Sequence, residues 1–136
     1  MSWLTGVVPI HFNHTIVHSA DRAVEARFFT EMFGLPPAVE MGHFLVAHIA
    51  DQASIDFMAA NGDVAGQHYA FLVSESDFDG IHGRIVDRGI QHWADPTAHR
   101  PGEINDHDGG RGVYFQSPSG HYLEIITRPY GGGEPV

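Results

Sequence analysis

The sequence carries the same order of elements twice, and this internal repeat limits the possible folds more than any other feature. The stretch 12–18 (FNHTIVH) predicts a strand, and the capping residues of 19–21 predict the start of a helix. Gly34 predicts the end of that helix. The expected buried stripe recurs at helical spacing and consists of Val24, Phe28, Met32 and Leu35.

The second half repeats this pattern with almost the same spacing. The stretch 67–73 (QHYAFLV) predicts a strand, 74–76 a helix cap, and Gly89 the helix end. The expected buried stripe of this helix is Phe78, Ile81 and Ile85. His14 lies 20 residues before Gly34, and His68 lies 21 residues before Gly89. The two histidines are therefore predicted to occupy equivalent positions.

Further strands complete each half. We expect strands at 43–50 and 54–59 in the first half, and at 112–116 and 122–127 in the second. Aligning the last strand of each half places Asp56 opposite Glu124. The extra length of the second half fits one loop, 95–108, which is rich in proline, glycine and charge.

The expected fold class is therefore α+β. Two βαβββ modules form a curved sheet or open barrel around a metal cleft, with the helices outside. We expect one domain over 7–130, with modules over 10–62 and 66–129 and a flexible tail over 131–136.

Three polar residues are the candidate metal ligands. The strand at 67–73 is apolar on both faces, which is typical of a strand covered on both sides. His14, His68 and Glu124 would then point into an apolar cleft, where a buried charge needs a partner. Two imidazoles and one carboxylate suit Fe(II), Mn(II), Zn(II) or Ni(II), and Fe(II) is favoured because this ligand set is usual for non-haem iron acting on oxygen.

The composition of the chain excludes several kinds of binding partner and metal site. Seven basic residues face 17 acidic ones, and the net charge of −10 argues against binding to nucleic acid. The chain has no cysteine, so thiolate metal sites and cysteine nucleophiles are excluded. The early apolar stretch 7–10 is too short for a signal peptide, and nothing is long enough for a membrane span, so we expect a cytoplasmic protein. Histidine is over-represented, with 11 copies, which favours metal chemistry.

Three motifs resemble those of the vicinal oxygen chelate superfamily, which includes glyoxalase I, fosfomycin-resistance enzymes, bleomycin-resistance proteins and extradiol dioxygenases. They are 13–15 (NHT), 67–71 (QHYAF) and 117–124 (SPSGHYLE). The resemblance covers the chain from about residue 12 to 128. It implies a metal-dependent enzyme, and it implies ligands at His14, His68 and Glu124. The substrate would be a small molecule with two adjacent oxygens that chelate the metal.

A longer match is similar to the signature segment of type I extradiol dioxygenases. It comprises Asn105-x-His107, Val113-Tyr114, Ser117-Pro118-x-Gly120 and Glu124, although Ser117 departs from that signature. The resemblance implies that His107 and Tyr114 handle protons and hold the bound diol. A phenol turned inward can donate to an oxygen of a bound ligand. An aromatic core position for Tyr114 and a solvated loop for His107 remain the alternatives.

Asp56 leaves a second function open, because glyoxalase-type members use a carboxylate at this duplicated position as a fourth ligand. Aspartate is one methylene shorter than glutamate, so we expect Asp56 to fall short of the metal and to act as a catalytic base beside it, with a buried hydrogen-bonding residue as the alternative. The alternatives to a dioxygenase are a glyoxalase-like isomerase or lyase, and a metal-free drug-sequestering protein of the bleomycin-resistance type. We also expect a homodimer, with the site completed within one chain or across two copies.

Overall fold

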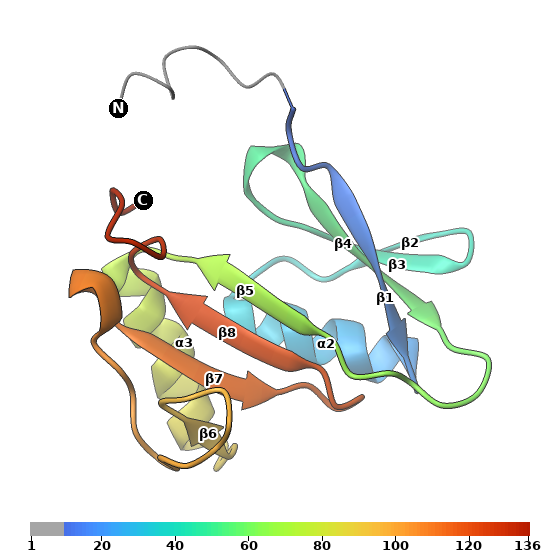
Figure 1. The fold of residues 1–136 in the computed structure, drawn as a ribbon. Helices are drawn as coiled ribbons and strands as arrows, with labels where there is room; N and C mark the ends of the chain where they lie inside the picture. Colours follow the sequence, from blue (N-terminus) through green and yellow to red (C-terminus); the bar gives the residue numbers. More distant parts are fainter. Residues whose placement is uncertain (1–9) are drawn as a thin grey trace.

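The computed structural model describes residues 10–136, so the expected domain start at residue 7 lies outside the described residues. The first half contains β1 (His14–Ser19), α2 (Arg22–Phe33), β2 (Val39–Met41), β3 (Phe44–His48) and β4 (Ser54–Ala59). The second half contains β5 (His68–Leu72), α3 (Glu75–Asp87), β6 (His92–Trp93), β7 (Gly112–Gln116) and β8 (Tyr122–Ile126) (Figure 1). Two short 3-10 turns, Ala50–Gln52 and His107–Gly109, precede β4 and β7. The predicted duplication is confirmed at the level of element order.

Each half forms its own four-stranded sheet, with order β1-β4-β3-β2 in the first and β5-β8-β7-β6 in the second. The first and last strands of each half run parallel, and the other pairs are antiparallel. The registers are equivalent: Asp56 pairs with Ile16 two positions after His14, and Glu124 pairs with Ala70 two positions after His68. The predicted correspondence of the histidines and of the carboxylates is therefore confirmed.

Both helices begin and end where the capping signals predicted. The Asp21 carboxylate accepts hydrogen bonds from two backbone amides in the first turn of α2, at 3.0 and 3.1 Å. Gly34 ends this helix with φ of 69°, a left-handed conformation that glycine adopts without strain. In α3 the Ser74 hydroxyl accepts from the Asp77 amide at 3.1 Å. Side-chain caps of this kind satisfy amides that have no partner inside the helix.

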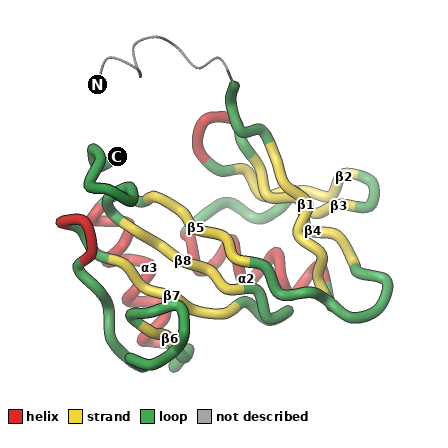
Figure 2. Tube along the Cα trace, in the orientation of Figure 1, coloured by secondary structure: helices red, strands yellow, loops and turns green. Residues whose placement is uncertain are grey.

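The two sheets lie side by side rather than closing into a barrel, and α2 runs behind the region between them (Figures 1 and 2). One core packs Met32 of α2 against α3, β7 and β8, including Phe78 and Phe115. The other packs Phe29 of α2 against β1, β3 and β4, including Phe57. Helix α2 is thus shared by both cores.

This shared position corrects part of the predicted α2 stripe. Met32 is fully buried as expected, but Val24 is 46% exposed, and Ala26 and Phe29 are buried in its place. The α3 stripe of Phe78, Ile81 and Ile85 is confirmed, because that helix faces a single core.

Two strands and one surface also differ from the sequence-based expectation. The edge strands β2 and β6, of three and two residues, were not predicted by position. The expectation that β5 is covered on both faces is wrong for the single chain, because His68, Ala70 and Leu72 on one face are exposed. The described part of the chain contains no helix that is long and apolar enough to cross a bilayer.

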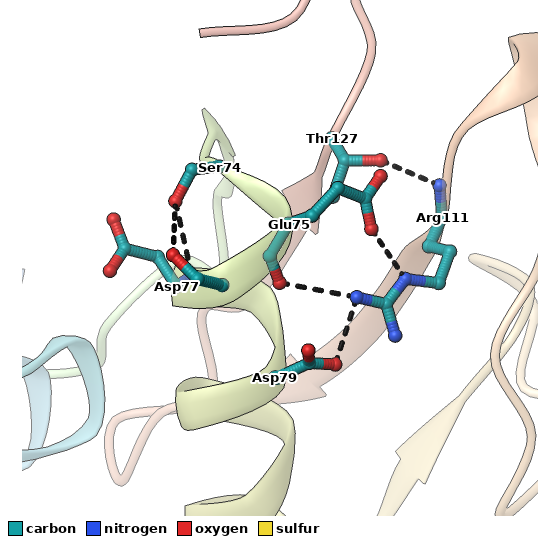
Figure 3. Close-up of polar contacts among 7 residues, drawn as sticks. Ser74, Glu75, Asp77, Asp79, Arg111 and Thr127 are labelled. Carbon is teal, nitrogen blue, oxygen red and sulfur yellow. Dashed lines mark hydrogen bonds and ion pairs between the residues drawn. The ribbon is translucent and has the colours of Figure 1, made fainter.

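Arg111 links the N-terminal turn of α3 to the second sheet through hydrogen bonds and ion pairs (Figure 3). Its guanidinium donates to the Glu75 carboxylate at 2.8 Å and lies 2.9 Å from the Asp79 carboxylate. Its backbone amide donates to the Thr127 hydroxyl at 2.8 Å, next to the end of β8. The guanidinium also lies over the Phe78 ring, 4.4 Å from the centroid, where the cation is attracted by the ring electrons.

Candidate metal site

The structure brings two of the predicted ligands together on the second sheet. His68 begins β5 and Glu124 lies in the middle of the neighbouring β8. His68 Nε2 is 2.9 Å from Glu124 Oε1. The carboxylate is 1% exposed, whereas the His68 side chain is 48% exposed. The pair therefore joins a buried carboxylate to an imidazole that remains open to the surface.

Two tyrosines complete the surroundings of this carboxylate. The Tyr130 hydroxyl lies 2.9 Å from Oε1 and 2.7 Å from Oε2 of Glu124. Tyr114 pairs with Glu124 in the antiparallel register of β7 and β8, so both side chains lie on the same face of the sheet. The Tyr114 ring meets His68 edge-on, with centroids 5.8 Å apart.

The two phenols are held in their protonated form. Burial raises the pKa of Tyr114 strongly, and the hydrogen bond with Tyr130 and the negative charge of Glu124 raise it further. The pKa of Tyr130 is also raised, by burial first and then by its hydrogen bond to Glu124. Both hydroxyls consequently act as hydrogen-bond donors toward the carboxylate near neutral pH.

His14 and Asp56 lie on the first sheet, away from this pair. His14 is exposed, and its Nδ1 donates to the side-chain oxygen of Asn13 at 2.7 Å. Asp56 accepts a hydrogen bond from the Ser54 hydroxyl at 2.7 Å. Between residues 10 and 136, no group of three or more histidine, aspartate or glutamate side chains is close enough to hold a metal. One chain alone thus presents His68 and Glu124 together, and His14 and Asp56 elsewhere.

His107 lies in the 3-10 turn before β7 and is exposed. Its backbone amide donates to the Asn105 side chain at 3.2 Å. Within the described residues its ring makes no hydrogen bond to His68 or Glu124. The neighbouring Asp108 is close enough for its charge to raise the pKa of Tyr130.

Tyr130 is the site residue that sequence reasoning missed. It follows β8 in the segment 127–130, outside any periodic pattern, and no motif marks it. The only available signal was an aromatic residue just after the strand that carries Glu124.

The residues of the second sheet fit two ligands of a divalent ion. A neutral imidazole nitrogen and a carboxylate oxygen that already approach within 2.9 Å are a suitable donor pair, and the protonated phenols add outer hydrogen-bond donors. The ligand count of one chain is incomplete, since stable sites of this kind use at least three protein donors.

The two-half architecture is shared with several solved structures. A lactoylglutathione lyase from Agrobacterium tumefaciens superposes with a TM-score of 0.66 at 17% identity, covering 87% of this chain and 93% of that one. The fosfomycin-resistance protein FosX from Mesorhizobium loti gives 0.62 at 16% identity, covering 90% and 95%. At such identities the likeness concerns the fold. The fold is therefore the one that the motifs resembling the vicinal oxygen chelate superfamily predicted.

Two other solved structures are much more similar in sequence. Oxidase ChaP-H1 is 55% identical, with a TM-score of 0.88, over 90% of this chain and 99% of that one. Oxidase ChaP-H2 is 50% identical, with a TM-score of 0.89, over 93% and 100%. No family sequence profile matches the chain, and no curated protein matches it.

Proposed function

We propose that this protein is a metal-dependent oxidase of the dioxygenase type, acting on a small substrate with two adjacent oxygens. The observation that carries the proposal is the His68–Glu124 pair at 2.9 Å beneath two protonated phenols. The two relatives at 50 and 55% identity are both named oxidases, which supports an oxidative reaction over other chemistry of the superfamily.

His68 Nε2 and Glu124 Oε1 would hold the ion, with Fe(II) favoured and Mn(II), Zn(II) or Ni(II) as alternatives. The ion supplies Lewis acidity toward adjacent oxygens of the substrate and, as Fe(II), access to oxygen chemistry. Tyr114 would orient the substrate by donating a hydrogen bond from the wall of the site. His107 would move protons at the rim, where its exposed position keeps it in contact with solvent.

The third ligand, His14, would come from a second copy of the chain. His14 lies exposed on the open face of the first sheet, two residues along β1 from Ile16, which is 41% exposed. The open face of the second sheet exposes Leu72 at 37% and Tyr122 at 36%. Placing the first sheet of one copy against the second sheet of another would cover these apolar residues and bring His14 to His68 and Glu124.

Mixing inactive variants tests this arrangement. His14→Ala and His68→Ala should each lose metal and activity as homodimers, because each removes one ligand from every site. Co-expressed with two different tags, they should recover about one quarter of the wild-type sites, since half of the random dimers are mixed and each holds one intact site. Iron content and oxygen uptake with a panel of diols measure the recovery.

A matched mixture provides the control. His68→Ala with Glu124→Ala should recover nothing, because both residues lie on the same sheet of the same chain. Equal recovery in both mixtures, or full metal content in either single variant, would overturn the shared site.

A glyoxalase-like isomerase is the second candidate, and the register of Asp56 favours it. Asp56 occupies in the first sheet the position that Glu124 occupies in the second, so the open face of one copy could supply a fourth ligand. Such an enzyme would turn over without consuming oxygen, and an oxygen electrode distinguishes the two functions.

A further inference from the structure

Tyr130 touches the candidate ligand carboxylate in a manner that the superfamily motifs do not account for. The residue is 65% exposed and lies beyond β8, yet its hydroxyl reaches a carboxylate that is 1% exposed. In Figure 1 the chain after β8 forms a compact turn beside the end of β5. The Gly132 amide donates to the Pro129 carbonyl at 3.0 Å, which closes this turn around Tyr130.

The two carboxylate oxygens of Glu124 have different partners. Oε1 lies 2.9 Å from both His68 Nε2 and the Tyr130 hydroxyl. Oε2 lies 2.7 Å from the Tyr130 hydroxyl, which is the shorter of the two phenol contacts. One hydroxyl carries one proton, so Tyr130 shares it unequally, with the closer contact on the oxygen that His68 does not touch.

We propose that Tyr130 is a positioning residue for the metal site, whose hydroxyl holds Oε2 of Glu124 and leaves Oε1 for the ion. The inference rests on the proposed function. An ion held by His68 and Glu124 would draw electron density from the ligating carboxylate oxygen and weaken it as a hydrogen-bond acceptor. The Tyr130 phenol would then donate its hydrogen bond to Oε2 alone, and the carboxylate would bind the ion through one oxygen in a fixed orientation.

Removing the hydroxyl has two consequences. The buried Oε2 loses its closest donor, and the carboxylate becomes free to turn or to bind an ion through both oxygens. Hydrogen bonds to a ligating carboxylate typically change metal affinity about 10- to 100-fold. A residue that only supports the fold would not alter how the carboxylate binds.

The test compares Tyr130→Phe with Tyr69→Phe in the full-length protein, with Co(II) as the probe. Tyr69 adjoins His68 on β5, but successive residues of a strand point to opposite faces, and Tyr69 contacts both hydrophobic cores. We expect Tyr130→Phe to weaken Co(II) binding about tenfold or more and to change the visible Co(II) absorption band. Tyr69→Phe should change neither.

Hydrogen exchange on the wild-type protein gives an independent readout that needs no variant. If the phenol stays on Oε2, the amide of Gly132 should remain protected, or become better protected, when Co(II) is added. Faster exchange there, or tighter Co(II) binding by Tyr130→Phe, would show that the phenol competes with the ion and would overturn the proposal. Unchanged affinity and spectrum in Tyr130→Phe would also overturn it while leaving the metal site intact. Absence of Co(II) and Fe(II) binding by the wild type would instead remove the proposed function, and the role of Tyr130 with it.

Discussion

His121 Nε2 donates a hydrogen bond to the carbonyl oxygen of His18 across 2.7 Å, joining the second half of the chain to the first. Its other ring nitrogen, Nδ1, accepts from the Gln67 amide at 3.0 Å, so the ring carries its proton on Nε2. The ring is 2% exposed. Nearby, the Ser119 hydroxyl accepts from the Ala20 amide at 2.9 Å, which adds a second link between the halves.

His121→Ala should therefore destabilise the whole fold. It removes the hydrogen-bond partner of the Gln67 amide and of the His18 carbonyl and opens a cavity at the buried ring, at a cost of about 3 kcal/mol. Urea unfolding followed by circular dichroism measures the loss. His99→Ala, which removes an imidazole that is 82% exposed, is the control and should change stability little. Equal effects of the two substitutions would contradict the role given to His121.

His68→Ala should abolish binding of one divalent ion per chain, because it removes the ligand closest to Glu124. Elemental analysis of protein purified without oxygen and without added metal measures the occupancy. His92→Ala serves as the matched control, because His92 lies on the edge strand β6 and its Nδ1 donates to the Ile90 carbonyl oxygen at 3.0 Å. Full metal occupancy in His68→Ala would show that His68 is not a metal ligand.

Asp56 and Glu124 separate the two candidate functions. Glu124→Ala should lose the ion, whereas Asp56→Ala should keep it and lose turnover or stability instead. The shorter side chain of Asp56 must span the same distance from an equivalent strand position, and it already accepts a hydrogen bond from Ser54. Metal content and oxygen uptake are measured on both variants. Equal metal loss would favour the glyoxalase-like isomerase.

Asp95 predicts a defined response to acid. The Thr97 hydroxyl donates to its carboxylate at 2.6 Å, and the amides of His99 and Arg100 donate at 3.0 and 2.8 Å. These hydrogen bonds, that of Thr97 foremost, lower the pKa of Asp95 from 3.8 to about 2. A carboxyl whose pKa is lower in the folded state stabilises that state above its unfolded pKa, and the stabilisation disappears as pH falls through the folded value.

Asp95→Asn should accordingly be less stable than the wild type at pH 6, and the difference should shrink between about pH 4 and pH 2. Urea unfolding at a series of pH values, with an NMR titration of the Asp95 carboxyl, measures both parts. A difference in stability that stays constant down to pH 2 would show that the effect is not due to ionisation.

Hydrophobic periodicity correctly predicted the buried residues of a helix that packs against a single core. The α3 stripe was predicted correctly because Phe78, Ile81 and Ile85 all face a single core. The α2 stripe was only partly right, because a helix that packs against two cores buries more than one stripe, and a period of 3.6 does not show which residues lie between them. Strands of two or three residues, such as β6 and β2, are too short to show a period.

The candidate site was also predictable only in part. Aligning the last strand of each half predicted that Asp56 and Glu124 are equivalent, and the observed registers confirm it. The position of His14 relative to His68 depends on how the two sheets lie, which no local pattern specifies. An apolar strand face also reads the same in sequence whether or not its own chain covers it, which explains the error over β5.

The place of α2 between the two cores has a consequence for how this duplicated chain can change. After duplication, two copies of a unit are free to diverge separately only if each keeps its own interior. Here Phe29 serves the first core and Met32 the second, from one helix encoded in the first repeat. The first repeat therefore supplies part of the interior of the second. A substitution in α2 must stay compatible with the cores of both halves, so the two repeats cannot diverge independently.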